Sequence, residues 1–414
     1  MKAERFTAGI FLCVITGMLA LAICSFIFLH AERSMDDRPA IKIDWEKLYP
    51  FEEDKKDTTS ASAMSSFYDY VKERLQRYVT ENLLGYHKIV ETAKKYEDAL
   101  CWNMVSVFDY NAVIKLKDGY LTSYTMSLDI MHDAEAVKEL SDFCEERGID
   151  FMYINFPAKI CKSEDKEISG VLDFANQNAD KLLDMLKEAG VKNYDFRKNL
   201  HEAGMKHHES FYVTDHHWKA ETGLWAAGEI LKILRDDWGW NVKPEILSPE
   251  NFDYVIYRDW FLGSQGQKMT LARAKPEDFT MIYPKFSTSI KFEVPSLGLK
   301  VSGDFGITYD MEQVESLDYY GRTPYSAYHY GEKPLIRAEN GLIEDEKSIL
   351  VIRDSFCDCV IPFLLLEVQH VDTINLRFFT GSIRNFIGTE HPNAVIVVYY
   401  SKIPGRYSNT YDFR

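Results

Sequence analysis

The chain has 414 residues, of which 46% are apolar and 27% are charged, and its formal net charge at pH 7 is −16. A chain of this length can bury one large core with an appendage, or two domains, and its composition is that of an ordinary folded protein. The negative charge and the lack of a Lys/Arg cluster argue against a nucleic-acid partner, because phosphate binding requires a basic patch.

The first expected element is a transmembrane helix at residues 6–29, a run without charged residues that is long enough to cross the hydrocarbon layer. Two basic residues lie within positions 1–5, so the positive-inside rule makes these residues a cytoplasmic tail and places the rest outside the cell membrane. Cleavage after Ala31 and lipidation at Cys24 are the alternatives. Leu29, however, is a poor residue for position −3 of a signal peptidase site, and the apolar run continues past Cys24. We therefore expect an uncleaved, single-pass signal anchor.

Three regions are expected after the anchor. Residues 30–63 are charged and rich in turn formers, which indicates a juxtamembrane stalk. In residues 64–99 apolar side chains recur at steps of three and four, as in one or two helices on the flank of the main domain. The main domain is expected at residues 100–414.

Strand and helix patterns alternate along most of the main domain. Helices are expected at about 134–147, 171–189, 219–236, 358–368 and 380–390. Strands are expected at about 149–155, 191–196, 348–353, 371–376 and 394–400. Continuous β-branched runs separated by helices indicate a mostly parallel sheet covered on both faces. The sequence therefore predicts a doubly wound α/β fold.

The alternation stops between about 240 and 345, where the sequence is rich in Tyr, Phe, Gly and Pro. Short strand-like runs at 252–257 and 289–294 indicate a β-rich insertion between a helix and the next core strand. Elaborations of this kind commonly hold substrate contacts. The tyrosines of the insertion, Tyr325 among them, either stack on sugar rings or, as is more usual, pack the loop onto the domain.

Seven cysteines are present, and the five outside the expected anchor have no regular spacing, so they do not form a disulfide framework. Cys144 and Cys161 either pair or are separate core residues. Cys357 and Cys359 are expected to be buried free thiols, because a bridge between residues two apart would be strained.

A carboxylate and an imidazole lie two residues apart in Tyr212-Val-Thr-Asp-His-His-Trp-Lys219. Thr214 and Asp215 are expected to start a helix, which would put His217 in the first turn, where the helix dipole favours a neutral imidazole. A neutral imidazole can act as a general base, and Asp215 can orient it through the other ring nitrogen. His216 is expected to point elsewhere and to be secondary.

Ser355 lies just past the strand expected at 348–353. Because ligands of an open parallel sheet sit outside the carboxyl ends of its strands, Asp354 and Ser355 are expected at the binding edge. Backbone N–H groups at the start of the next helix could hold an oxyanion there. Capping of that helix by either residue is the alternative, but the His217 motif favours a nucleophile, since hydroxyl, imidazole and carboxylate together make an activated serine.

Zinc is the alternative interpretation of the histidine pairs 207–208 and 216–217 with Asp215, since zinc accepts these ligand types. The HExxH spacing is missing, however, and adjacent histidines cannot easily aim both rings at one ion. We therefore expect neither a metal nor another cofactor.

The insertion also contains Trp260-Phe-Leu-Gly-Ser-Gln-Gly-Gln-Lys268. Gly263 and Gly266 permit a close approach of the backbone, and the N–H groups beside them could complete an oxyanion hole. A plain turn between two strands is the alternative, because two glycines and a serine also make turns.

Four motifs resemble those of one known family. Thr214-Asp-His-His-Trp218 is the motif that names the DHHW proteins, which are similar to the SGNH-hydrolase-like O-acetyltransferase domain of the alginate acetylation proteins AlgX and AlgJ. The resemblance covers about residues 100–414. It also includes Pro157-Ala-Lys159, Gly263-Ser264 and Asp354-Ser-Phe356. The Asp-His and Ser motifs together are specific, whereas the other two are weak.

The resemblance implies a three-layer α/β/α domain in which Ser355 is the nucleophile, His217 the base and Asp215 the orienting acid. Weaker oxyanion or substrate-binding roles are implied for Gly263, Ser264, Lys159, Arg353 and Trp218. Arg353 is also a departure, because the family pattern expects a glycine there, and a basic side chain would crowd or charge the site.

Relatives transfer acetyl groups onto exopolysaccharide outside the cytoplasmic membrane, often with a multipass MBOAT-type protein that supplies the acetyl donor. The resemblance therefore implies a carbohydrate O-acetyltransferase with a polysaccharide acceptor. Two rivals stay open. One is a carbohydrate esterase that resolves the same acyl-enzyme with water, and the other is a non-catalytic envelope polysaccharide assembly protein that keeps the fold.

Overall fold

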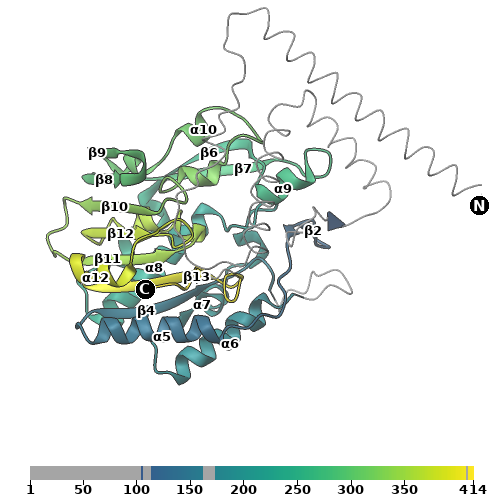
Figure 1. Cartoon of the computed structure of the whole chain (residues 1–414). Coiled ribbons are helices and arrows are strands. Elements are labelled where there is room, and N and C mark those ends of the chain that lie inside the picture. The colour runs from purple at the N-terminus through teal and green to yellow at the C-terminus, as the bar shows by residue number, and fades with distance from the viewer. Residues whose placement is uncertain (1–103, 106–112, 162–172, 407–408) are drawn as a thin grey trace, which may run out of the picture. The chain divides into compact units, whose positions relative to one another are not determined.

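The computed structural model describes residues 104–105, 113–161, 173–406 and 409–414 (Figure 1). The chain divides into two compact units, of which only Lys94–Arg414 contains described residues. The expected cytoplasmic tail, transmembrane helix, stalk and flanking helices, at residues 1–99, therefore lie outside the described residues. Within the described ranges, no helix has the length and apolar character needed to cross a membrane.

One sheet of eight strands forms the centre of the domain, in the order β5-β4-β13-β11-β12-β10-β8-β9 (Figure 1). Its first five strands are mutually parallel: β5 (Asn193–Asp195), β4 (Asp150–Phe156), β13 (Ala394–Tyr400), β11 (Ser348–Arg353) and β12 (His370–Ile374). The antiparallel strands β10 (Leu335–Asn340), β8 (Ile290–Val294) and β9 (Leu299–Gly303) extend it. The predicted mostly parallel sheet is confirmed.

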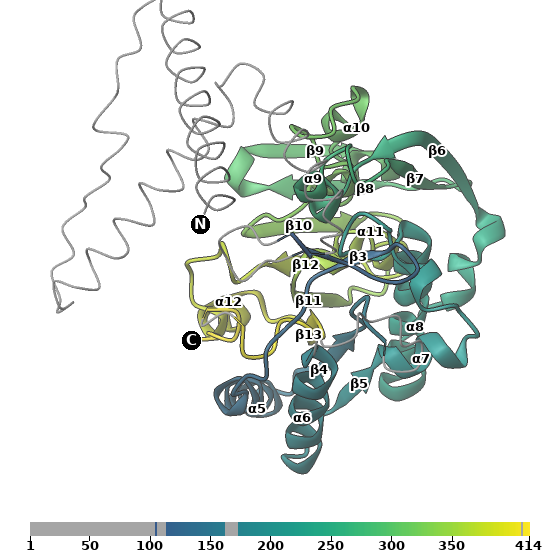
Figure 2. The same cartoon turned by 90° about the vertical axis from the view of Figure 1, so that its right-hand side faces the viewer.

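Helices lie on both faces of this sheet, with α5 and α12 on one side and α8 and α11 on the other (Figure 2). Among the residues that the structure describes, the helices that flank the sheet are α5 (Met131–Glu145), α6 (Ala175–Glu188), α7 (Phe196–Glu202), α8 (Ala220–Trp238), α11 (Ile361–Leu364) and α12 (Ile383–Glu390). Every residue of β13 is buried, and all but the first residues of β4 and β11 are too. Coverage of both faces explains why these strands are continuous apolar runs in the sequence.

The helix expected at 358–368 is much shorter than predicted. The chain forms a 3-10 turn, η7 (Ser355–Cys357), and then the four-residue helix α11, with Pro362 in its first turn. Proline has no N–H to donate and its ring clashes with the carbonyl four residues earlier, so a helix beginning at Asp358 could not continue through it.

Residues 240–345 are β-rich, but they do not stand apart from the core. β6 (Phe252–Phe261) and β7 (Glu277–Pro284) form a two-stranded antiparallel sheet joined by α9 (Ser264–Met269), whereas β8, β9 and β10 extend the main sheet. α10 (Glu312–Glu315) follows β9. Near the start of the domain, β1 (Met104–Val105), β2 (Val113–Lys115) and β3 (Leu121–Thr122) form a small sheet.

The remaining elements are short 3-10 turns. They are η1 (His208–Ser210), η2 (Pro244–Leu247), η3 (Pro249–Asn251), η4 (Pro295–Leu297), η5 (Phe305–Thr308) and η6 (Pro324–Ala327). Two of them, η1 and η6, lie next to residues of the candidate site.

The four cysteines among the described residues follow the expectation of a domain that does not depend on disulfide bridges. Cys357 and Cys359 are buried free thiols, as predicted. Cys144 and Cys161 are not joined to each other, so of the two alternatives the structure has separate residues.

Close packing between α8 and the segment after Ser355 gives a test of the core. A side chain at Gly223 would collide with the backbone carbonyl and sulfur of Cys359, whereas one at Gly228 on the same helix would meet nothing within 4 Å. We expect Gly223→Ala to lower the free energy of unfolding by about 1–3 kcal/mol. Gly228→Ala should raise it by about 0.5–1 kcal/mol, since alanine loses less backbone entropy.

Urea unfolding of the two variants beside the wild type measures both effects. If Gly223→Ala matched or exceeded Gly228→Ala in stability, the described contact of α8 with Cys359 would be wrong.

Candidate active site

The Asp215–His217 segment is a tight turn closed by backbone hydrogen bonds. The Tyr212 N–H donates to the His217 carbonyl over 3.1 Å, and the Lys219 N–H donates to the Ser210 carbonyl over 2.9 Å. α8 begins only at Ala220. The prediction that His217 lies in the first turn of this helix was therefore wrong, because the ladder across the turn holds residues 212–219 out of helical geometry.

The turn brings Asp215 and His217 to Ser355, which lies 138 positions from His217 in the sequence. His217 Nε2 lies 2.7 Å from Ser355 Oγ, and His217 Nδ1 lies 2.5 Å from Asp215 Oδ1. With the Nδ1–H donating to the carboxylate, Nε2 is left to accept the serine hydroxyl. This is the hydrogen-bond order that activates a serine for attack on an acyl group.

The Asp215 carboxylate is buried and stays ionised because its neighbours compensate for the lost solvation. Burial by itself would raise its pKa, but the charges of His216 and His217 and the hydrogen bonds from His217 hold this pKa well below its usual value. The His217 N–H donates to Oδ1 over 3.0 Å, and the Ser264 N–H donates to Oδ2 over 2.6 Å. A carboxylate held in this way stays available to orient the imidazole.

The His217 ring is held between two other rings. Tyr325, from η6, is stacked on it with the ring centroids 3.9 Å apart and an interplanar angle of 12°. His216 lies against it at a centroid distance of 3.8 Å, with a third of the His216 side chain exposed. Partial burial and the neighbouring His217 lower the pKa of His216 well below its usual value. His217 therefore has little freedom to rotate away from Ser355.

Several bonds fix the backbone around Ser355. Asp354 caps η7: its Oδ1 accepts the Phe356 N–H and its Oδ2 accepts the Tyr400 N–H, both over 2.8 Å. The indole N–H of Trp218 donates to the Phe356 carbonyl over 3.0 Å. Capping is thus the role of Asp354, while Ser355, which is only half-buried, presents its hydroxyl to His217.

Gly263 and Ser264 contact the site through their backbone, in a way different from the expected oxyanion hole. The Gly263 N–H donates to Thr214 Oγ1 over 3.0 Å, and the Ser264 N–H donates to Asp215 Oδ2. A Cβ at Gly263 would collide with the Asp215 side chain. The Ser264 N–H therefore holds the acid of the site and the Gly263 N–H holds the residue before it, so neither donor is free for an incoming oxyanion.

Lys159 and Trp218 are buried beneath the site, where they hold its loops. The Lys159 ammonium donates to the carbonyls of Leu121, over 2.6 Å, and Asp215, and lies 3.4 Å from Gln265 Oε1. Burial lowers the pKa of Lys159 to about 7, opposed by the charge of Asp215. In this arrangement the ammonium supports the turn from below, and a bound substrate would not reach it.

Arg353 does not crowd Ser355. Its side chain is completely buried, where Nη1 lies 2.5 Å from Asp358 Oδ1 and Nη2 donates to the Gly331 carbonyl over 2.8 Å. Burial raises the pKa of Asp358 to about 7, although the charge of Arg353 acts in the opposite direction. The expected crowding of the site is absent because the guanidinium points into the core and is paired there.

Sequence reasoning missed Glu277, at the start of β7. Its carboxylate accepts the N–H groups of Val213, over 2.8 Å, and Thr214, over 2.7 Å, together with the Thr214 hydroxyl. It thereby fixes the residues just before Asp215. No local pattern marks this glutamate, because its partners lie more than sixty positions away in the sequence.

A metal at this site would compete with the hydrogen bonds already described. Asp215, His216 and His217 offer ligand atoms within 4.8 Å of one another. His217, however, uses one ring nitrogen for Asp215 and the other for Ser355, so binding an ion would break one of these bonds. The arrangement favours proton transfer over metal ligation.

Comparison with known proteins shows what the domain is similar to. Residues 117–247 match the family model of the SGNH hydrolase-like domain of acetyltransferase AlgX. The resemblance predicted from the sequence motifs is confirmed. The matched segment includes Lys159, Asp215 and His217 and ends before Ser355. No curated protein sequence shows significant similarity to the chain.

Solved structures share the fold over most of the chain. PatB1 of Bacillus cereus, in a structure with a sulfonyl adduct, matches with a TM-score of 0.61 at 19% identity, covering 74% of this chain and 100% of PatB1. A DHHW family protein from Eubacterium siraeum matches with a TM-score of 0.52 at 16% identity, covering 75% and 96% of the respective chains. At these identities the likeness shows a common fold.

The buried carboxylate of Asp354 predicts how stability depends on pH. Burial raises its pKa from 3.8 to about 6. Between these values the folded protein binds more protons than the unfolded one, so the stability contributed by Asp354 decreases as the pH rises from about 4 to 6. At 1.36 kcal/mol per pKa unit the change is at most about 3 kcal/mol.

Urea unfolding of the wild type and Asp354→Asn across this pH range checks the prediction. The free energy of unfolding of the asparagine variant should fall less steeply than that of the wild type as the pH rises, because the amide does not titrate. Parallel pH profiles for the two proteins would show that Asp354 has no raised pKa.

Proposed function

We propose that this protein is a carbohydrate O-acetyltransferase that works through an acyl-enzyme on Ser355. The observation that supports the proposal most directly is the 2.7 Å contact between Ser355 Oγ and His217 Nε2, with Asp215 on the other ring nitrogen. The match of residues 117–247 to an acetyltransferase-type domain points in the same direction.

In the first half-reaction, Ser355 Oγ attacks the acetyl carbonyl of the donor while His217 takes the hydroxyl proton. The resulting oxyanion is assigned to the Ser355 N–H, since the Asp354 carboxylate takes the next N–H, that of Phe356. As the intermediate collapses, His217 gives the proton to the leaving group. The bond between the acetyl carbon and the leaving group breaks, so the products are acetyl-Ser355, the deacetylated donor and a neutral imidazole.

In the second half-reaction, a sugar hydroxyl attacks acetyl-Ser355 and His217 takes its proton. Collapse of this intermediate breaks the bond between the acetyl carbon and Ser355 Oγ, and His217 returns the proton to the serine. Ionised Asp215 stabilises the imidazolium formed in each half-reaction. Asp215 itself keeps its charge throughout, which agrees with the lowered pKa of its carboxylate.

The nearest rival is a carbohydrate esterase, in which water resolves the same acetyl-enzyme. Ser355, His217 and Asp215 serve both reactions equally, so the acceptor alone separates them. A non-catalytic envelope assembly protein is a weaker rival, because such a protein has no need for a serine within 2.7 Å of an oriented imidazole.

The cellular setting is also proposed. An anchor at residues 6–29 would hold the domain outside the cytoplasmic membrane, near a polysaccharide acceptor. A multipass MBOAT-type protein is the partner that the family resemblance suggests as the source of the acetyl group.

Covalent labelling tests the nucleophile. PatB1 has been captured with a sulfonyl adduct, and we expect phenylmethanesulfonyl fluoride to sulfonylate Ser355 of this protein. Intact-mass measurement should show one adduct, peptide mapping should place it on Ser355, and Ser355→Ala should abolish it. His217→Ala should slow labelling by on the order of 10²-fold or more, because the hydroxyl loses its base.

Ser264→Ala is the matched control. Ser264 is a second serine whose hydroxyl lies beside a histidine, His216, and the alanine variant retains the backbone N–H that supports Asp215. Its labelling should equal that of the wild type. An adduct that persists in Ser355→Ala would show that Ser355 is not the nucleophile.

Acceptor dependence separates transfer from hydrolysis. Incubation with a chromogenic acetyl ester and a series of oligosaccharides should give acetylated sugar, detected by mass spectrometry, and Ser355→Ala should give none. Release of the chromophore at a rate that no sugar changes, with acetate as the product, would favour the esterase.

A further inference from the structure

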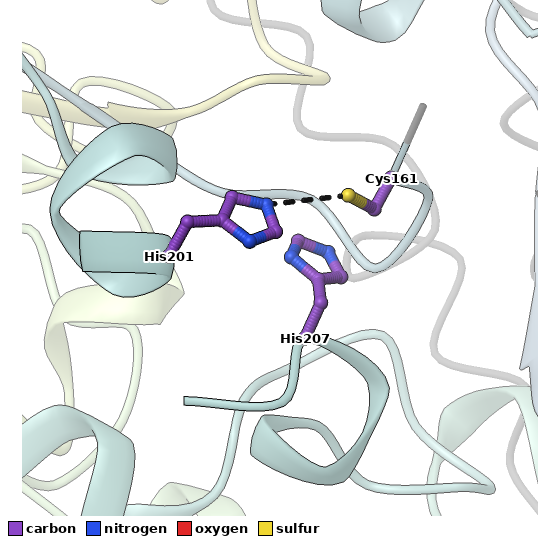
Figure 3. A group of neighbouring side chains, drawn as sticks. All are labelled: Cys161, His201 and His207. Atoms are coloured by element: carbon purple, nitrogen blue, oxygen red, sulfur yellow. Dashed lines mark hydrogen bonds between the residues drawn. The ribbon is translucent and has the colours of Figure 1, made fainter. Parts of the chain in front are cut away.

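A second cluster of reactive side chains lies where the loop that follows β4 meets α7 and η1. It contains Cys161 from that loop, His201 from the last turn of α7, and His207 just before η1 (Figure 3). Each offers a ligand atom, and the three atoms all lie within 4.8 Å of one another. The reaction proposed for Ser355 uses none of these residues.

The three side chains converge, as Figure 3 shows. Cys161 Sγ lies 3.4 Å from His201 Nε2, and the rings of His201 and His207 are stacked with centroids 5.7 Å apart and an interplanar angle of 17°. Zinc bonds of about 2.1 Å to nitrogen and 2.3 Å to sulfur put tetrahedral ligand atoms roughly 3.5 Å apart. The Cys161–His201 pair already has this separation. The exposed His201 side chain has room to close the remaining gap.

A hydrogen bond on the far side of the ring orients His207. Its Nε2 lies 2.8 Å from the Ala158 carbonyl, and this bond requires the proton on Nε2. The lone pair of the neutral ring is then on Nδ1. Metal-binding histidines are commonly oriented by such a bond from the other ring nitrogen to a backbone carbonyl.

The space around the cluster leaves room for a fourth ligand. The three residues line a cavity of about 330 Å³ together with Asp180, Asp195 and other side chains. Both carboxylates already bind Arg197, at 2.7 Å from Asp180 and 2.8 Å from Asp195. Water is therefore the expected fourth ligand.

We propose that Cys161, His201 and His207 bind a zinc ion. One thiolate and two imidazoles are ligands that Zn²⁺ prefers, and hard cations such as Mg²⁺ and Ca²⁺ would reject them. This proposal departs from the expectation of no metal, which was argued from the spacing of the two histidine pairs. His207 belongs to one of those pairs, but its partners in this cluster are Cys161 and His201. The sequence spacing gives no hint of it, because Cys161 lies forty residues from His201.

The ion would tie the loop after β4 to α7 and η1. The same loop contains Ala158, whose carbonyl orients His207, and Lys159, whose ammonium binds the carbonyl of Asp215. The bound metal would thus stabilise the backbone that supports the turn around Asp215.

Cobalt binding to the purified full-length protein in detergent tests the site. After chelator treatment, Co²⁺ should bind with one equivalent per chain and give a thiolate-to-cobalt charge-transfer band, which Zn²⁺ should remove by displacement. Cys161→Ser should lose the band, and His201→Ala should weaken binding at least about tenfold. His201 is exposed, so its variant is expected to fold, which melting curves verify.

Two control variants lie outside the cluster: Cys144→Ser, at a buried free thiol of α5, and His132→Ala, at an imidazole whose side chain is 76% exposed. Both should bind Co²⁺ as the wild type does. Three results would each overturn the proposal: no charge-transfer band in the wild type, binding that survives Cys161→Ser but is lost in His216→Ala, or alkylation of Cys161 by iodoacetamide at a rate that Zn²⁺ does not slow.

Discussion

The ionised carboxylate of Asp215, buried under the candidate site, is the constraint on which the rest of the structure depends. A charge removed from water is tolerated only where hydrogen-bond donors replace the solvent. Two backbone N–H groups, from His217 and Ser264, and the His217 ring supply them. Each donor also defines geometry: the ring donor aims Nε2 at Ser355, and the Ser264 donor requires a close approach of the insertion.

The insertion between α8 and β11 thus forms part of the candidate site. The Ser264 N–H donates to Asp215, and Glu277 accepts the N–H groups of the two residues that precede Asp215. Tyr325 stacks on the His217 ring. β8, β9 and β10 fasten the insertion to the main sheet, so these contacts stand on a rigid frame. A frame of this kind keeps the imidazole within hydrogen-bond reach of the serine and leaves little to reorganise.

Buried charges gather where the parallel strands end. Lys159 follows β4, Arg353 is the last residue of β11, and both are almost completely buried. Removing charge from water costs free energy, and each side chain recovers it through backbone carbonyls or a carboxylate. These buried, hydrogen-bonded side chains make the backbone beneath Ser355 and the Asp215 turn rigid. A rigid backbone suits a site that keeps a hydroxyl, an imidazole and a carboxylate in hydrogen-bonding order.

The sequence by itself determined the order of strands and helices, the mostly parallel sheet, and the residue types of the candidate site, because periodicity and motif spacing are local properties. Only the tertiary structure decided the partners: the N–H groups of Gly263 and Ser264 serve Thr214 and Asp215, and Arg353 turns inward to Asp358. Likewise, Cys161 meets His201 and His207 only after folding. A sequence shows which chemical groups a chain possesses. Whether a group is buried and what it hydrogen-bonds to depend on the distant segments that approach it, and only the packing of the folded chain decides which segments those are.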